Sequence, residues 1–164
     1  MRNTEALDQQ EETIIQHRIT VPLAPQAAFT AFAEELGNWW PAAYTWAQDV
    51  LETIAIEPQE NGRCFERGLH NFECDWGRVL QWQPPHQLAF TWQISPRREP
   101  APNPENASEI HLRFEPEADG SGTQILFEHR HLDSHGEGWQ DYHTALASAP
   151  GWSYILDCYV NYVS

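Results

Sequence analysis

In several segments between residues 15 and 131, hydrophobic and polar residues alternate, and this period of two is typical of half-buried β-strands. A first strand is predicted at 15–21, where Pro22 ends it because proline cannot continue a sheet ladder. An Asn61-Gly62 turn joins two later strands, since this pair accepts positive φ at low cost. The pattern predicts about seven strands, at 15–21, 51–57, 63–68, 76–82, 88–94, 109–115 and 125–131.

The clearest hairpin is the stretch 76–92, which reads WGRVLQWQPPHQLAFTW. Its second arm places Leu88, Phe90 and Trp92 at every second position. Pro84 and Pro85 separate the arms, and neither can donate to a sheet ladder, so the chain turns there. The sheet is therefore expected to be antiparallel. The preceding stretch, 69–75, has no clear period and fits either a short loop or a continuing strand with a bulge.

The period changes to that of an α-helix in three places. One helix starts near Pro25, a favourable first-turn residue, and ends before Gly37. A second is predicted at 138–147. After a break at Pro150, a last helix of about 13 residues begins at Trp152 and is roughly 20 Å long, enough to cross four or five strands. Its apolar stripe consists of Trp152, Ile155, Leu156, Tyr159, Val160 and Val163.

The hairpin motif Trp-Gly-x-Val-Leu-x-Trp-x-Pro-Pro, followed by Leu-x-Phe-Thr-Trp, resembles proteins related to the activator of the 90-kilodalton heat-shock chaperone's ATPase. The resemblance extends from Ile14 onward and includes 61–63, 128–130 and 151–152. It implies membership of the START-like, or SRPBCC, superfamily with the helix-grip fold. That superfamily includes lipid carriers, hormone receptors, aromatases and cyclases, so the fold by itself does not specify a function.

Pattern and resemblance lead to the same fold class, an α+β helix-grip fold. We expect a curved antiparallel sheet of six or seven strands around a long C-terminal helix, with two short helices after the first strand. Residues 13–164 are predicted to form one domain, since 164 residues suit a single core. Residues 1–12 are polar and charged and are predicted to be a flexible leader.

The charge balance excludes several classes of partner. The chain has 24 acidic and 9 basic residues, for a formal net charge of -15, which repels phosphate backbones and anionic lipid headgroups. We therefore expect neither nucleic-acid binding nor membrane association. Three cysteines without metal-ligand spacing argue against a disulfide framework and a zinc knuckle, and the N-terminus lacks the features of a signal peptide. A cytoplasmic location is predicted.

Candidate chemistry is sparse. His129 and His131 lie two apart on a predicted strand, but no further histidine has the spacing to complete a metal site, so no metal and no cofactor are expected. His129 fits a hydrogen-bonded wall residue or a polar group inside a ligand pocket. Glu66, Arg67 and Arg78 fit surface ion pairs, with burial around a polar ligand head as the alternative. Because no catalytic motif is present, an enzyme is the less expected class.

Aromatic residues carry the most information. The chain has eight tryptophans, and four aromatic residues lie within the irregular stretch 38–46, where they either cap the core or form the lid of a pocket. A sheet wrapped around one helix leaves a cavity, which these rings either fill or line. The predicted ligand-binding residues are Trp39, Trp40, Trp46, Phe65, Trp76, Phe90, Trp92, Phe114, Phe127, His129, Trp152 and Leu156.

Three functions are compatible with these features. The first is binding of a small hydrophobic or aromatic ligand between the sheet and the last helix, by a monomer or a homodimer. The second is an interaction module for a chaperone ATPase, as the resemblance implies, although this chain has no room for the additional N-terminal domain of the eukaryotic co-activators. The third is a catalyst resembling polyketide aromatases and cyclases, for which His129 is the plausible proton carrier.

Overall fold

The computed structural model describes residues 13–164, so the predicted leader at 1–12 lies outside the described residues. Seven antiparallel strands form one sheet in the order β1-β7-β6-β5-β4-β3-β2. All neighbours pair antiparallel, as the hairpin patterns predict. The strands are β1 (Ile15–Val21), β2 (Thr53–Ile56), β3 (Arg63–Arg67), β4 (Glu73–Gln83), β5 (Gln87–Trp92), β6 (Ser108–Pro116) and β7 (Thr123–Arg130).

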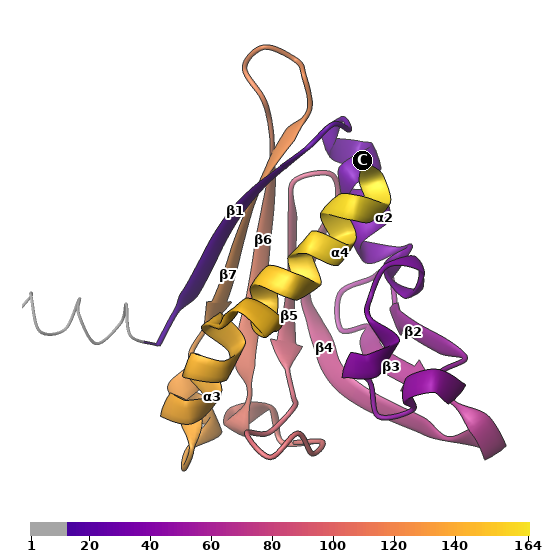
Figure 1. Ribbon diagram of the computed structural model, residues 1–164, viewed down its shortest axis with the longest axis vertical. Helices are drawn as coiled ribbons and strands as arrows, with labels where there is room; N and C mark the ends of the chain where they lie inside the picture. Colours follow the sequence, from indigo (N-terminus) through magenta and orange to yellow (C-terminus); the bar gives the residue numbers. More distant parts are fainter. Residues whose placement is uncertain (1–12) are drawn as a thin grey trace, which may run out of the picture.

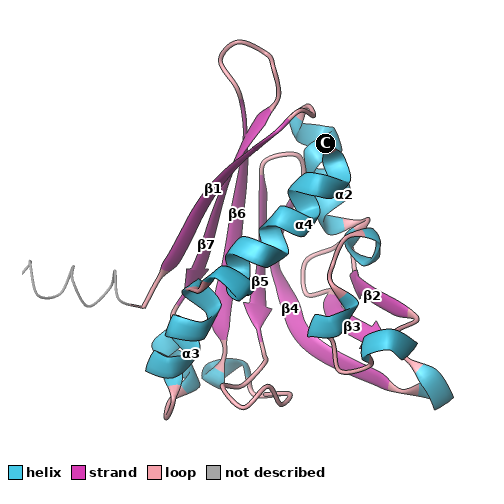
Figure 2. Ribbon diagram, in the orientation of Figure 1, coloured by secondary structure: helices cyan, strands magenta, loops and turns pink. Residues whose placement is uncertain are grey.

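The sheet curls around the C-terminal helix, which crosses it diagonally (Figure 1). The helix-grip fold class is confirmed. The α-helices are α2 (Pro25–Ala33), α3 (Trp139–Ala147) and α4 (Tyr154–Val163). Short helical turns connect them, and several of these lie beside β2 and β3 (Figure 2). These turns are η1 (Leu36–Asn38), η2 (Ala42–Tyr44), η3 (Gln48–Val50), η4 (Leu69–Asn71), η5 (Pro104–Asn106), η6 (Leu132–His135) and η7 (Ala149–Ser153).

The stretch that sequence patterns leave undecided divides into two parts. Residues 69–71 form the turn η4, and β4 then begins at Glu73, three residues before the predicted hairpin. Where β4 bends, an added Cβ on Gly77 would lie 2.2 Å from the carbonyl oxygen of Thr91 on β5. Only glycine allows the two strands to approach this closely, which explains the glycine in the Trp76-Gly77 motif.

The stripe of α4 faces the concave side of the sheet, as predicted. Trp152, Leu156 and Tyr159 are at most 1 % exposed, and the Tyr159 hydroxyl donates to the carbonyl oxygen of Ala28 on α2 at 2.8 Å. The helix proper starts at Tyr154 rather than Trp152, because the chain first makes a wide π-helical turn, η7. This turn places Trp152 beneath the helix, at the centre of the core.

The end of the last strand differs from the prediction in a way that affects the candidate histidines. Strand β7 ends at Arg130, and His131 adopts a left-handed conformation with φ of 62°. His131 is exposed, whereas His129 is fully buried, so the two imidazoles do not share a face. The period of two fails here because the chain turns into η6 directly after Arg130, one residue before the predicted end of the strand.

Candidate ligand-binding cavity

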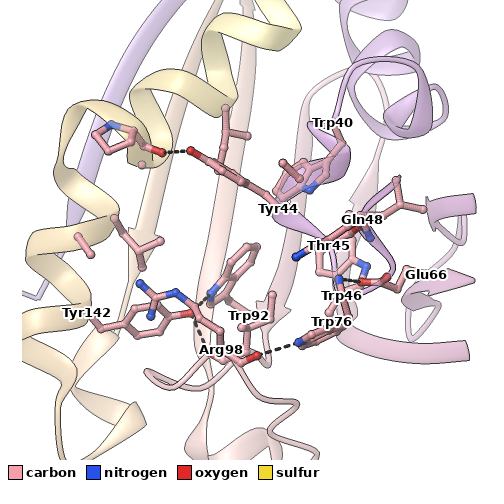
Figure 3. Close-up of a pocket in the computed structure, with 18 of the residues that line it drawn as sticks. Trp40, Tyr44, Thr45, Trp46, Gln48, Glu66, Trp76, Trp92, Arg98 and Tyr142 are labelled. Atoms are coloured by element: carbon pink, nitrogen blue, oxygen red, sulfur yellow. Dashed lines mark hydrogen bonds between the residues drawn. The ribbon is translucent and has the colours of Figure 1, made fainter. Parts of the chain in front are cut away.

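A cavity of about 540 Å³ lies between the sheet, the α3–α4 junction and residues 39–50, which we call the lid segment. Its volume is within the usual range for small-molecule sites. Figure 3 shows Trp40 and Trp46 on one side of the cavity and Tyr142, from α3, on the opposite side. The aromatic lining residues are Trp40, Tyr44, Trp46, Trp76, Trp92 and Tyr142.

A buried carboxylate holds the lid segment against the sheet. Glu66, on β3, is 2 % exposed, and its two oxygens accept from the backbone N–H groups of Trp46 at 3.0 Å and Ala47 at 2.9 Å. A carboxylate satisfied by two backbone donors can remain buried where a bare charge could not. The expectation of a surface ion pair therefore fails for Glu66, while Arg67 and Arg78 do pair with Glu73 and Asp75 on the outer face.

Two further hydrogen bonds connect the lid segment to the other walls of the cavity. The Tyr44 hydroxyl donates to the carbonyl oxygen of Pro150 in η7 at 2.7 Å. The Trp46 indole N–H donates to the carbonyl oxygen of Arg98, in the β5–β6 loop, also at 2.7 Å. Together with the bonds to Glu66, these two contacts attach the lid segment to η7, to the β5–β6 loop and to β3.

Two indole N–H groups of the cavity wall have no hydrogen-bond partner. The rings of Trp40 and Trp76 stack with centroids 6.1 Å apart and planes 20° apart. Both residues line the cavity, and the Nε1 atom of each is buried and unpaired. The other buried indoles are satisfied, because Trp39 donates to Ala31 and Trp92 to Tyr142. Because each Nε1 is covered by protein atoms, these two residues present ring surface rather than a free N–H group to the cavity.

Tyr142 forms the opposite wall and is fixed by its hydroxyl. This oxygen accepts from the Trp92 indole N–H at 2.7 Å and donates to the carbonyl oxygen of Ile94 at 2.8 Å. Burial raises the pKa of Tyr142 to about 12, so the phenol stays protonated at neutral pH. Its ring therefore serves as a rigid, neutral surface.

His129 lies behind this wall in a buried hydrogen-bond chain. Its Nδ1 accepts from the Trp152 indole N–H at 2.9 Å, so its proton is on Nε2, which donates to Ser108 Oγ at 2.6 Å. Ser108 Oγ in turn lies 2.7 Å from Nε2 of His135, to which it can donate. Burial holds the pKa of His129 well below its usual value and lowers that of His135 to about 4. Both imidazoles are therefore neutral at physiological pH.

This neutrality predicts a loss of stability in mild acid. The unfolded chain takes up a proton on each imidazole below about pH 6.5, whereas the folded chain does so only at much lower pH. The free energy of unfolding is therefore highest above about pH 6.5, where both imidazoles are neutral in either state. It decreases as the pH falls toward about 4, because only the unfolded chain binds the protons. We expect the urea midpoint to fall between about pH 7 and about pH 5. In His135→Gln the fall should be smaller, and an equal fall in both proteins would contradict this prediction.

The comparisons with known proteins agree with this geometry. Residues 24–163 match the family model described as Activator of Hsp90 ATPase homolog 1-like protein. The chain belongs to this family. The resemblance seen in the hairpin motif is thereby confirmed, and the fold is of the type that binds hydrophobic ligands in general. No curated protein matches the chain in a sequence search.

Three solved structures illustrate the range of this fold. An anthrahydroquino-γ-pyrone synthase, Txn09, complexed with SUM, is 30% identical, with a TM-score of 0.63, and the match covers 90% of this chain and 95% of that chain. The self-sacrificing resistance protein CalC from Micromonospora echinospora is 19% identical, with a TM-score of 0.62 and coverage of 93% and 94%. The Aha1 dimer from Colwellia psychrerythraea is 15% identical, with a TM-score of 0.58 and coverage of 92% and 95%.

Within this family member, the twelve predicted ligand-binding residues separate into three groups. Four of them line the cavity, namely Trp40, Trp46, Trp76 and Trp92. Seven are buried in the core outside the cavity lining, namely Trp39, Phe90, Phe114, Phe127, His129, Trp152 and Leu156. The ring of Trp152 packs 4.6 Å from that of Phe127 and 5.1 Å from that of Trp92, centroid to centroid. Aromatic rings therefore fill the space under η7 and line the space beside it.

Phe65 forms the third group and corrects the prediction. It lies on the outer face of β3, where the guanidinium carbons of Arg63 and Arg67 are 4.5 and 5.0 Å from its ring centroid. Residues two apart on a strand share a face, so Phe65 points away from the cavity and its neighbour Glu66 points toward it. Flanking arginines cover the ring, which is why it is nearly buried without belonging to the core.

Sequence reasoning missed three residues that shape the cavity. Tyr142 lies on a predicted helix but has no periodic partner that marks it as a wall residue. Arg98 belongs to a stretch that is rich in proline and has no hydrophobic period, yet it lines the cavity. Glu66 was considered only as an ion-pair residue or a ligand contact, not as an acceptor for the lid segment. None of the three has a local signal, because each acquires its role from a segment distant in sequence.

Within residues 13–164 no cluster of histidine, cysteine and acidic side chains could hold a metal ion. The three cysteines are free, and only Cys64 is buried. None of the described helices is both long enough and apolar enough for a transmembrane span. The cavity is therefore the principal candidate site in the described part of the chain.

Proposed function

We propose that this protein binds one flat, oxygen-bearing aromatic molecule, of the size of a polyketide-derived ring system, in the cavity beneath the lid segment. The observation that carries the proposal is the stacked pair of Trp40 and Trp76 in a cavity wall that also includes the rings of Trp46, Trp92 and Tyr142. Stacked indoles favour a planar ring, and the guanidinium donors of Arg98 that are left free at the wall favour a carbonyl or hydroxyl oxygen on it.

The likeness to a synthase supports this ligand class. The 30% identical relative is named for making an anthrahydroquino-γ-pyrone, a fused aromatic product rich in oxygen, and the match covers nearly all of both chains. A cavity lined by Trp40, Trp76 and Trp92 has the apolar, ring-rich surface that such a molecule needs. The ligand class thus agrees with both the wall chemistry and the relative.

Titration with an oxygenated aromatic probe tests the proposal. We expect dihydroxyanthraquinone to quench tryptophan emission, after correction for absorbance, with saturation at one equivalent. Micromolar affinity requires only about 8 kcal/mol. The variant Trp76→Phe should bind about two- to tenfold more weakly, because it loses part of the stacking surface.

The control variant is Trp139→Phe, since Trp139 is only partly buried and lies outside the cavity lining. Its affinity should match that of the wild type. Absence of any saturable change across a varied aromatic panel contradicts the proposal. An equal loss in both variants would place the probe elsewhere on the protein.

Catalysis of ring closure is a second candidate, favoured only by the synthase relative. His129 is unsuited as its proton carrier, because both its ring nitrogens bond to protein groups and it does not line the cavity. At the cavity wall the oxygens of Glu66 and Tyr142 are likewise bonded to protein groups, whereas Arg98 has free donors. Mass spectra of the titration mixtures distinguish a binder, which returns its ligand unchanged, from a catalyst. Interaction with a chaperone ATPase and the oligomeric state both stay predictions.

A further inference from the structure

Most arginines of this acidic protein are paired with carboxylates. Among residues 13–164, five arginines have an acidic partner within 4.0 Å, namely Arg63, Arg67, Arg78, Arg113 and Arg130. Arg18, Arg97 and Arg98 have no such partner among the described ion pairs. Two of these three are adjacent in the β5–β6 loop, at the edge of the cavity. An unpaired cation is unexpected in a chain with a net charge of -15, where acidic partners are abundant.

The loop backbone fixes where Arg98 lies. Ser95 Oγ accepts from the backbone N–H groups of Arg97 at 3.2 Å and Glu99 at 3.1 Å, and the Arg98 N–H donates to the Ser95 carbonyl oxygen at 2.8 Å. Arg98 itself has φ of 64°, a backbone conformation that residues other than glycine rarely adopt. Its carbonyl oxygen is the one that accepts from Trp46 of the lid segment. The loop is thus a tight turn that carries Arg98 to the meeting point of the cavity walls.

The guanidinium of Arg98 is also held in place. Its central carbon lies 4.5 Å from the ring centroid of Tyr142, and Nη1 donates to the carbonyl oxygen of Pro96 at 2.7 Å. Tyr142 is immobilised in turn by its bonds to Trp92 and Ile94. A guanidinium has five N–H donors, and only one is used by the protein here. The remaining donors are positioned on a rigid aromatic surface and are available to an acceptor.

Charge is distributed unevenly around the cavity. Arg98 is the only cation and Glu66 the only anion among its described lining residues. Figure 3 shows the Arg98 guanidinium beside Tyr142 on one side and Glu66 on the other. Both oxygens of Glu66 are occupied by the lid segment, whereas Arg98 has free donors. An acidic group would therefore be attracted to the Tyr142 side and repelled from the Glu66 side.

From these contacts we infer that the ligand is an acidic aromatic, whose carboxylate or ionised phenol pairs with the guanidinium of Arg98. This inference rests on the proposed function and adds the charge and the orientation of the ligand. The ring system lies against Trp40 and Trp76, and the acidic group lies at Tyr142. Arg98 also borders a second, more polar cavity of about 740 Å³, so the acidic group can keep some of its water. The cost of desolvating the charge is thereby reduced.

A matched pair of probes tests the inference. Anthraquinone-2-carboxylate and anthraquinone-2-carboxamide share one ring system and differ in charge. We expect the wild type to bind the acid about fivefold more tightly than the amide, the upper end of the range for an exposed ion pair, since Arg98 is exposed. Arg98→Gln should abolish this preference while changing amide affinity less than about twofold, and Arg98→Lys should restore part of it.

The control variant is Arg97→Gln, because Arg97 borders only the second cavity. It should retain the preference for the acid. The ratio of the two affinities is measured within each variant, so a change in folded fraction cancels. Equal affinity of the wild type for both probes, or equal weakening of both by Arg98→Gln, overturns the inference while leaving the proposed function standing. Failure of both probes to bind the wild type overturns the proposed function and this inference together.

Discussion

Replacing Trp152 with alanine is expected to lower the free energy of unfolding by about 3 to 5 kcal/mol, the range for truncating a large buried aromatic side chain. Trp152 is 1 % exposed and packs against the rings of Phe127 and Trp92. Its indole N–H is also the partner of His129 Nδ1, which the truncation leaves without a donor. The cost therefore combines a cavity in the core with a lost buried hydrogen bond.

Urea denaturation followed by circular dichroism measures this effect. Trp152→Phe retains an aromatic ring but loses the N–H donor, so its loss should be intermediate. The control is Leu80→Ala, because Leu80 is 41 % exposed and its truncation should cost no more than about 0.5 kcal/mol. A loss below about 1 kcal/mol for Trp152→Ala would contradict the central position of this residue in the core.

Replacing Glu66 with leucine is expected to release the lid segment. The substitution leaves the backbone N–H groups of Trp46 and Ala47 without acceptors, and each unsatisfied donor costs about 1 to 3 kcal/mol. Removing a buried charge offsets part of this cost, so we expect a net loss of about 2 to 4 kcal/mol in the free energy of unfolding or of lid closure. Opening exposes both donors to water, which makes it the favoured response.

Amide hydrogen exchange at Trp46 and Ala47 reports this opening directly. We expect their exchange to accelerate by roughly 30-fold or more in Glu66→Leu, since a loss of about 2 kcal/mol corresponds to that factor. Glu66→Gln keeps one acceptor and should give a smaller acceleration. Glu99→Gln is the control, because Glu99 is exposed and makes no described side-chain hydrogen bond. Unchanged protection in Glu66→Leu would show that other contacts hold the lid segment.

The two substitutions act on different parts of one arrangement. Trp152 belongs to the aromatic rings that fill the core under η7, whereas Glu66 bonds the lid segment at the wall of the cavity beside it. Loss of Trp152 should therefore lower global stability, and loss of Glu66 should mainly change ligand entry and retention. Comparing the rates of ligand release from the two variants distinguishes an effect on the core from an effect on the lid segment.

Local pattern alone indicated the strands and α-helices of this fold, although not all of their ends or the short helical turns. The period of two in the strands, the period of 3.6 in the last helix and the prolines at 84 and 85 each depend on neighbouring residues, so they can be recognised without tertiary information. The stripe through Trp152 and Leu156 predicted correctly which face of α4 is buried. The hairpin motif also identified the family, because its glycine and tryptophans meet local demands of a tightly bent sheet.

Only the tertiary structure decided which aromatic rings fill the core and which line the cavity. Composition showed that rings were available, but the choice between Trp152 and Trp76 depends on how far the lid segment and α3 stand from the sheet. The same holds for Glu66, whose burial depends on backbone donors twenty residues earlier in the chain. Arg98 and Tyr142 are 44 positions apart in the sequence, yet the guanidinium of Arg98 lies on the ring of Tyr142. Such pairings arise from long-range packing, for which the linear pattern holds no signal.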